Sequence, residues 1–199
     1  MSAAMPTPIL NPCSAGGLPP SRRALLLDRD GVINVNFGYV HTPETTEWVE
    51  GIDALCVAAQ SAGFGLVVVT NQAGIGRGLY TEAQLADYTA WMLRQLSARG
   101  IDILRVYYCP HHPTAGQGIY RAQCACRKPA PGMILAAARD LGIDLAGSVM
   151  IGDKASDMQA ALAAGVGRCI QIDDPLDARL PGVAYVRDLS QAREVLLGA

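Results

Sequence analysis

The stretch LLLDRDGVIN at residues 25–34 sets two aspartates directly after a run of leucines. Residues 24–27 have the length and apolar character of a buried β-strand. Because side chains alternate in direction along a strand, Asp28 and Asp30 can face the same way at its carboxyl end, and Gly31 permits a sharp exit. One carboxylate could then attack phosphorus while the second donates and later removes a proton. The alternative is a strand-end turn with two solvated acids.

Apolar runs of the same kind recur along the chain, at residues 66–70, 104–108, 149–151, 169–172 and 183–186. Helical faces separate several of them: Ile52, Leu55, Cys56 and Ala59 form one, Leu85, Tyr88, Met92 and Leu96 a second, and Ile134, Ala137, Ala138 and Leu141 a third. Continuous apolar strands that alternate with helices predict an α/β fold with a doubly wound parallel sheet, covered on both faces. Ligands of such sheets bind at the carboxyl ends of the strands.

Local signals predict where two of these helices begin and end. Thr81 followed by Gln84 is a capping-box start for the second helix. Pro131 suits the first turn of the third helix, and Gly142 lies where a left-handed C-terminal cap is common.

The composition predicts a single soluble domain over residues 23–199. With 199 residues and 50% hydrophobic content, the chain has enough apolar material for one core. The net charge of −2 disfavours a nucleic-acid partner, and no apolar stretch approaches the roughly 20 residues that span a bilayer.

Residues 1–22, rich in Pro, Ser, Ala and Gly and without a signal-peptide pattern, are expected to form a disordered extension. We expect a cytoplasmic monomer with no nucleic-acid or membrane partner.

Further candidate catalytic and binding residues lie next to other predicted strands and helices. Thr70 ends the second apolar run, where its hydroxyl can donate to a phosphoryl oxygen. Lys128, just ahead of the third helix, can neutralise an attacking carboxylate, and Arg127 could grip a second phosphate. Asp153, with Asp28 and a backbone carbonyl, offers the oxygen ligands that Mg²⁺ prefers. Each could instead be a cap, a turn or a solvated surface residue, but their combination indicates a phosphoryl-transfer site.

The motifs DRDGVIN, VVVTNQ, RKP and IGDKASD, in that order, resemble those of the haloacid dehalogenase (HAD) phosphatases, from about Arg23 to the C-terminus. Within that superfamily the chain is most similar to the heptose bisphosphate phosphatases, through NFGYVH at 36–41, TNQAGIGRG at 70–78, YYCPHHP at 107–113 and CRKPAPGM at 126–133. The resemblance implies a Rossmann-like HAD fold with a minimal cap. It also implies a Mg²⁺-dependent phosphatase that acts on a small sugar phosphate.

The resemblance further implies a role for each matching residue. Asp28 would form an aspartyl-phosphate, Asp30 would be the general acid and base, and Thr70 and Lys128 would steady the phosphoryl group. Mg²⁺ would lie between Asp28, the Asp30 carbonyl and Asp153. The implied substrate contacts are Asn36, Phe37, Gly38, Tyr39, Thr70, Asn71, Gln72, Ala73, Arg127, Lys128 and Lys154.

Two positions depart from the family pattern, since Asn36 stands where Asp is common and Ala73 where Ser is common. These departures bear on the preferred sugar rather than on the reaction. The histidinol-phosphate phosphatases share the motifs and are the nearest alternative, although Arg127 favours a bisphosphate. A phosphoacceptor receiver module would also place acids, a threonine and a lysine at sheet ends, but it needs no second acid such as Asp30.

Residues 109–126 break the α/β pattern with a Pro-, Gly-, Cys- and His-rich segment. Cys109 with His111, and Cys124 with Cys126, form two tight pairs that supply three sulfurs and one nitrogen. That set suits tetrahedral Zn²⁺ with no open position, which indicates a structural site that orders the loop. The resemblance assigns His111, rather than His112, as the ligand. The alternative is a loop with scattered thiols.

Overall fold

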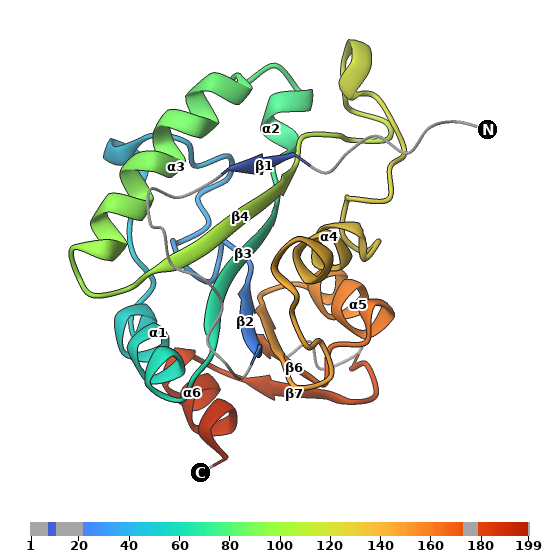
Figure 1. Ribbon diagram of the computed structural model, residues 1–199. Helices are drawn as coiled ribbons and strands as arrows, with labels where there is room; N and C mark the ends of the chain where they lie inside the picture. The colour runs from blue at the N-terminus through green and yellow to red at the C-terminus, as the bar shows by residue number, and fades with distance from the viewer. Residues whose placement is uncertain (1–7, 11–21, 173–178, 199) are drawn as a thin grey trace.

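A computed structural model describes residues 8–10, 22–172 and 179–198 and has a seven-stranded sheet at its centre (Figure 1). The strands lie in the order β1-β4-β3-β2-β5-β6-β7. Their bounds are Ile9–Leu10 (β1), Ala24–Leu27 (β2), Gly65–Asn71 (β3), Ile103–Cys109 (β4), Val149–Gly152 (β5), Arg168–Ile172 (β6) and Val183–Val186 (β7). Strands β2 to β7 pair in parallel, and β1 runs antiparallel to β4. The predicted parallel sheet is confirmed, with its six predicted strands in place.

Helices cover both faces of the sheet, as predicted (Figure 1). Helices α1 (Ile52–Ser61), α3 (Glu82–Ser97) and α6 (Leu189–Leu197) lie on one face, and α4 (Gly132–Leu141) and α5 (Ala155–Ala164) on the other. Connections carry the short helix α2 (Ala73–Gly76) and the 3-10 turns η1 (Pro43–Thr45) and η2 (Gly118–Tyr120). In β2, Leu25 and Leu27 pack toward α1, α3 and α6, whereas Ala24 and Leu26 pack toward α4 and α5. Burial on both faces explains the unbroken apolar run.

The predicted helix ends are close to those observed. The capping box of α3 is present, because Thr81 Oγ1 accepts from the Gln84 amide at 3.1 Å and Gln84 Oε1 accepts from the Thr81 amide at 2.8 Å. Gly142 closes α4 with φ of 71°. Pro131 is the N-cap of α4 rather than a first-turn residue, so this helix begins one position later than predicted.

The prediction of a disordered segment over residues 1–22 is wrong for Ile9–Leu10. These residues form β1 on the free edge of β4, with Ile9 opposite Tyr107 and Leu10 opposite Val106. An edge strand offers unpaired backbone groups that even two residues can satisfy, and the composition of the segment does not reveal that pairing. Residues 1–7 and 11–21 lie outside the described part of the chain.

The order of the strands creates a crevice at the carboxyl end of β2. From β2 the chain builds β3 and β4 on one side, and it then crosses over to place β5 on the other side. Such a reversal of strand order marks the ligand site of an open α/β sheet. The Asp28 amide continues the pairing by donating to the Ile151 carbonyl at 3.0 Å, so the acids after β2 and β5 meet at this point. No helix in residues 8–10, 22–172 and 179–198 has the length and hydropathy needed to cross a bilayer.

Candidate active site

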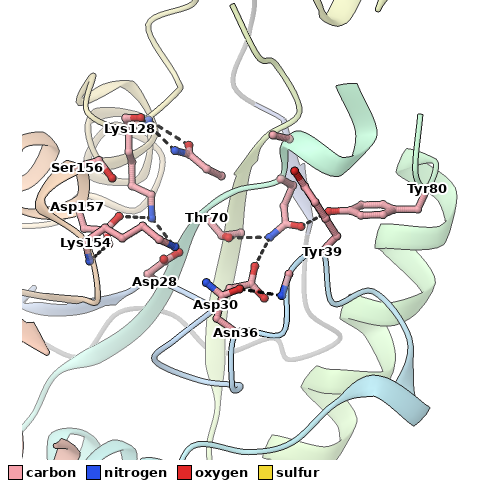
Figure 2. Close-up of a pocket in the computed structure, with 14 residues that line it drawn as sticks. Asp28, Asp30, Asn36, Tyr39, Thr70, Tyr80, Lys128, Lys154, Ser156 and Asp157 are labelled. Carbon is pink, nitrogen blue, oxygen red and sulfur yellow. Dashed lines mark hydrogen bonds and ion pairs between the residues drawn. The ribbon is translucent and has the colours of Figure 1, made fainter. Parts of the chain in front are cut away.

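A pocket of about 300 Å³ opens at the carboxyl ends of β2, β3 and β5 (Figure 2). The residues that line this pocket come from widely separated segments of the chain, so the sequence motifs meet at one place. The lining residues are Asp28, Asp30, Asn36, Gly38, Tyr39, Thr70, Asn71, Gln72, Ala73, Tyr80, Lys128, Lys154, Ser156 and Asp157.

The ammonium group of Lys128 lies between two buried carboxylates. Its Nζ atom is 2.8 Å from Asp28 Oδ1 and 2.7 Å from Asp157 Oδ1, and it donates to the Val69 carbonyl at 2.8 Å. Burial acts to lower the pKa of Lys128, but the charges of Asp157 and Asp28 outweigh burial and raise it above its ordinary value. Lys128 therefore carries a full positive charge beside Asp28.

The backbone around Lys128 is fixed to β3 by one side chain. Asn71 accepts from the Lys128 amide and donates to the Lys128 carbonyl, both at 3.1 Å. This two-point contact joins the segment after Cys126 to the end of β3, 57 residues earlier in the chain.

Asp30 lies on the opposite side of the pocket in a dense network of donors (Figure 2). The buried Arg29 guanidinium pairs with it at 2.8 Å, and Asn34 and Gln72 each donate to it at 3.0 Å. Burial acts to raise the pKa of Asp30, but Arg29 and these hydrogen bonds outweigh that effect and lower it. These contacts favour the ionised form of Asp30 over the protonated one. Arg29 Nη2 also donates to the Val40 carbonyl at 2.6 Å, which ties Asp30 to the loop over residues 36–41.

Three carboxylates gather where Mg²⁺ is expected. Ligand atoms of Asp28, Asp153 and Asp157 lie within 4.8 Å of one another. Burial raises the pKa of Asp28 to about 7, with Lys128 opposing and the neighbouring acids adding to the shift. Asp153 Oδ1 is buried without a hydrogen-bond partner among the described residues. An unsatisfied carboxylate oxygen beside crowded acids fits a hard divalent cation.

The second predicted metal cluster is also assembled. Cys109, His111, Cys124 and Cys126 offer ligand atoms within 4.8 Å of one another. The contacts within the cluster run from 3.1 Å between the sulfurs of Cys126 and Cys124 to 3.7 Å between Cys109 Sγ and His111 Nδ1. Ligands at the usual distances around tetrahedral zinc are about 3.4–3.8 Å apart, so the donor set fits that ion. The His112 ring turns away and accepts through Nδ1 from the amides of its own loop.

Most of the predicted substrate contacts lie around the pocket, and two do not. Phe37 is 63% exposed and belongs to a neighbouring hollow, and Arg127 donates to the His111 carbonyl at 3.0 Å beside the pocket. The pocket also includes Tyr80, Ser156 and Asp157, which were not among the predicted site residues. Asp157 accepts from the Lys154 amide at 3.1 Å at the start of α5, and its ion pair is with Lys128.

Paired acids after the first parallel strand, with a threonine, a lysine and a third acid from the neighbouring strand ends, define the class of HAD phosphatases. Comparison with known proteins agrees, because the HAD-hydrolase-like family profile matches residues 125–170. D-glycero-beta-D-manno-heptose-1,7-bisphosphate 7-phosphatase from Escherichia coli K12 is 51% identical over 144 residues, 72% of this chain and 75% of the relative. The enzyme of that name from Vibrio cholerae is 49% identical over 152 residues, 76% of this chain and 82% of the relative. The chain belongs to this family of heptose bisphosphate phosphatases within the HAD superfamily.

Two solved structures share the fold. A HAD-like phosphatase from Mesorhizobium loti superposes with a TM-score of 0.86 at 35% identity. The match covers 96% of this chain and 90% of the other. The D,D-heptose 1.7-bisphosphate phosphatase from B. bronchiseptica, complexed with magnesium and phosphate, has a TM-score of 0.77 at 32% identity. That match covers 88% of this chain and 98% of the other.

We predict that Gly31→Ala disables the site more than it destabilises the fold. Gly31 has φ of +95°, and a Cβ there would lie 2.3 Å from Asp153 Oδ2, so the Asp153 carboxylate must move. We expect kcat to fall at least about tenfold, since moving a carboxylate out of the expected Mg²⁺ site weakens transition-state stabilisation. Gly100→Ala is the matched control, because Gly100 has φ of +77° with no atom within 4 Å of such a Cβ. Both variants should lose about 1–2 kcal/mol of stability. Equal kcat values in the two variants would contradict the prediction.

Proposed function

We propose that this phosphatase removes the 7-phosphate of D-glycero-D-manno-heptose 1,7-bisphosphate by way of an aspartyl-phosphate on Asp28, within ADP-heptose biosynthesis. The relatives that cover most of the chain carry this substrate and position in their names. The observation that carries the proposal is the placement of Asp28, which lines the pocket with its carboxylate 2.8 Å from the Lys128 ammonium.

In the first step an Asp28 oxygen attacks phosphorus and the bond from phosphorus to the sugar oxygen breaks. Lys128 neutralises charge on Asp28 and on the transferring group, and the Thr70 hydroxyl donates to a phosphoryl oxygen. Asp30 enters this step carrying the proton that it took from water in the preceding turnover, and it gives that proton to the departing sugar oxygen. The products are the sugar with a free hydroxyl at this position and the acyl phosphate of Asp28.

In the second step water attacks the phosphorus of the acyl phosphate and Asp30 accepts its proton. Inorganic phosphate leaves and the Asp28 carboxylate is restored, so the cycle needs no further reactant. The interactions of Arg29, Asn34 and Gln72 that lower the pKa of Asp30 favour the ionised form required here. Mg²⁺ held by Asp28, Asp153 and the Asp30 carbonyl would supply positive charge for the phosphoryl oxygens when bound.

The second phosphate of the substrate would be recognised outside the reacting centre. Arg127 lies beside the pocket with one guanidinium nitrogen bound to the carbonyl of His111, a member of the Cys/His cluster. Lys154 lines the pocket with a side chain that is 54% exposed. These two cations support a bisphosphate substrate, since a planar guanidinium can hold a phosphate through two hydrogen bonds.

A substrate panel tests the proposal directly. We expect kcat/KM for heptose 1,7-bisphosphate to exceed that for histidinol phosphate by at least about tenfold, because one charge-assisted contact to the second phosphate is worth roughly 1.5–3 kcal/mol. The panel should include both anomers and heptose 7-phosphate. Asp28→Asn serves as the control for contaminating phosphatases and should be inactive. A preference for histidinol phosphate would reject the proposed substrate but leave the reaction class intact.

We predict that Arg127→Ala raises KM for the bisphosphate about tenfold and changes KM for a monophosphate by less than about twofold. The reason is that only the bisphosphate offers the remote anion to this side chain. Steady-state kinetics on both substrates measures the difference. Arg77→Ala provides a comparison, because Arg77 is an exposed arginine whose guanidinium lies 5.8 Å from the ring centroid of Tyr39, a residue that lines the pocket. Equal effects of Arg127→Ala on both substrates would assign Arg127 to the architecture of the loop.

The two metals should separate in a chelation experiment, because a closed sulfur-rich site and an open oxygen site differ in ligand type and exchange. Mild EDTA should abolish activity, and Mg²⁺ alone should restore it while about one zinc per chain stays bound. Cys124→Ser should lower both the zinc content and the stability. Cys56→Ala, at a buried cysteine outside the cluster, should keep its zinc. Active enzyme without zinc, or recovery with zinc alone, would contradict this division of roles.

A further inference from the structure

Tyr80 lines the active-site pocket, yet no step above assigns it a role. It is 4% exposed, and its hydroxyl donates to Gln72 Oε1 at 2.6 Å. Figure 2 shows dashed lines running from the Tyr80 hydroxyl, through one amide side chain, to Thr70 and to Asp30. Tyr80 is therefore connected to two groups of the proposed reaction through a single residue.

The hydroxyl of Tyr80 fixes which way the Gln72 amide points. Because Oε1 accepts from Tyr80, the NH₂ end of the amide faces the reacting centre. Gln72 Nε2 donates to Thr70 Oγ1 at 2.8 Å and to Asp30 Oδ2 at 3.0 Å. Gln72 is only 2% exposed, so water competes little for these contacts. Gln72 was predicted to contact substrate, but its amide is engaged with protein groups.

The contact from Gln72 decides how the Thr70 hydroxyl can act. A hydroxyl has one proton to donate and two lone pairs that accept. Because Thr70 Oγ1 already accepts from Gln72, its own proton remains free for an acceptor in the pocket. A phosphoryl oxygen bound there is such an acceptor, and hydrogen bonds linked in series strengthen one another.

We propose that Tyr80 is a positioning residue for phosphoryl transfer. Its hydroxyl orients the Gln72 amide, and this amide in turn directs the Thr70 hydroxyl toward the phosphoryl group and holds the Asp30 carboxylate. The proposal rests on the proposed roles of Thr70 and Asp30 in the phosphatase reaction.

The ring of Tyr80 is held rigidly, as a positioning role requires. It stacks on His41 with centroids 4.4 Å apart and an interplanar angle of 17°. The ring also lies so close to α2 that a Cβ on Gly74 would be 2.2 Å from Tyr80 Cε1. Burial also raises the pKa of Tyr80 to about 12, so the hydroxyl keeps its proton at neutral pH and remains a donor.

The test is Tyr80→Phe, which keeps the ring and removes the hydroxyl. We expect kcat for the phosphatase reaction to fall roughly 3- to 10-fold, the value of one neutral hydrogen bond, with KM unchanged within about twofold. Tyr108→Phe is the matched control. Tyr108 packs in the same apolar cluster as Tyr80, but its hydroxyl donates to Glu82 at 2.6 Å and not to Gln72. This control should keep kcat within about twofold of wild type.

A double-mutant cycle with Gln72→Met shows whether Tyr80 acts through Gln72. If it does, Tyr80→Phe lowers kcat in the wild-type background but has little further effect once the amide is gone. A folded Tyr80→Phe with wild-type kcat, or effects that multiply in the double variant, would overturn the proposal. Should Tyr80→Phe not fold, Gln72→Met decides, because unchanged kcat in that variant also overturns it. Full activity of Asp28→Asn would instead reject the proposed mechanism itself, so the two failures are distinguishable.

Discussion

The buried ammonium of Lys128 is the contact on which the rest of the site depends. Asp28 and Asp157 are 4% and 1% exposed, and Lys128 is 3% exposed between them. Two carboxylates could not be buried this close together as anions without a cation, because an uncompensated buried charge costs about 3–5 kcal/mol. The strand ends of β2 and β5, the start of α5 and the segment after Cys126 therefore assemble as one unit. In the proposed mechanism, the same charge that stabilises this assembly also activates Asp28 for attack on phosphorus.

The position of Lys128 is in turn set by the cysteine-rich loop. Cys126 lies two residues before Lys128 and belongs to the Cys/His cluster, while Asn71 binds the Lys128 backbone to the end of β3. Arg127 stands between these two fixed points and contacts the His111 carbonyl. A loop without an apolar core of its own thus places Arg127 and Lys128 near the carboxyl edge of the sheet. If the Cys/His cluster holds zinc as proposed, the ion would hold the loop that carries Arg127 and Lys128.

The sequence revealed the strands and the strand-end chemistry because both depend on local order along the chain. The two acids that follow residues 24–27, Thr70 near the end of β3 and Asp153 after β5 converge because parallel strands share one carboxyl edge. Side-chain contacts between residues far apart in the chain could not be predicted from the sequence pattern. The pairing of Asp157 with Lys128 rather than Lys154, and the path from Tyr80 to Thr70, depend on side-chain directions set by tertiary packing. Strand β1 escaped prediction because the edge of β4, rather than the composition of its own two residues, specifies it.

The central claim is that the phosphoryl group passes through Asp28, and chemical trapping tests it most directly. Wild-type enzyme is mixed with heptose 1,7-bisphosphate and Mg²⁺, quenched in acid during turnover and reduced with borohydride, which converts an acyl phosphate of aspartate to homoserine. Peptide mass spectrometry then locates the change. The account predicts homoserine at position 28 only in samples that received substrate, and unmodified aspartate at Asp30 and Asp153. Trapping at another carboxylate, or failure to trap Asp28 under conditions where the acyl phosphate accumulates, would contradict the mechanism.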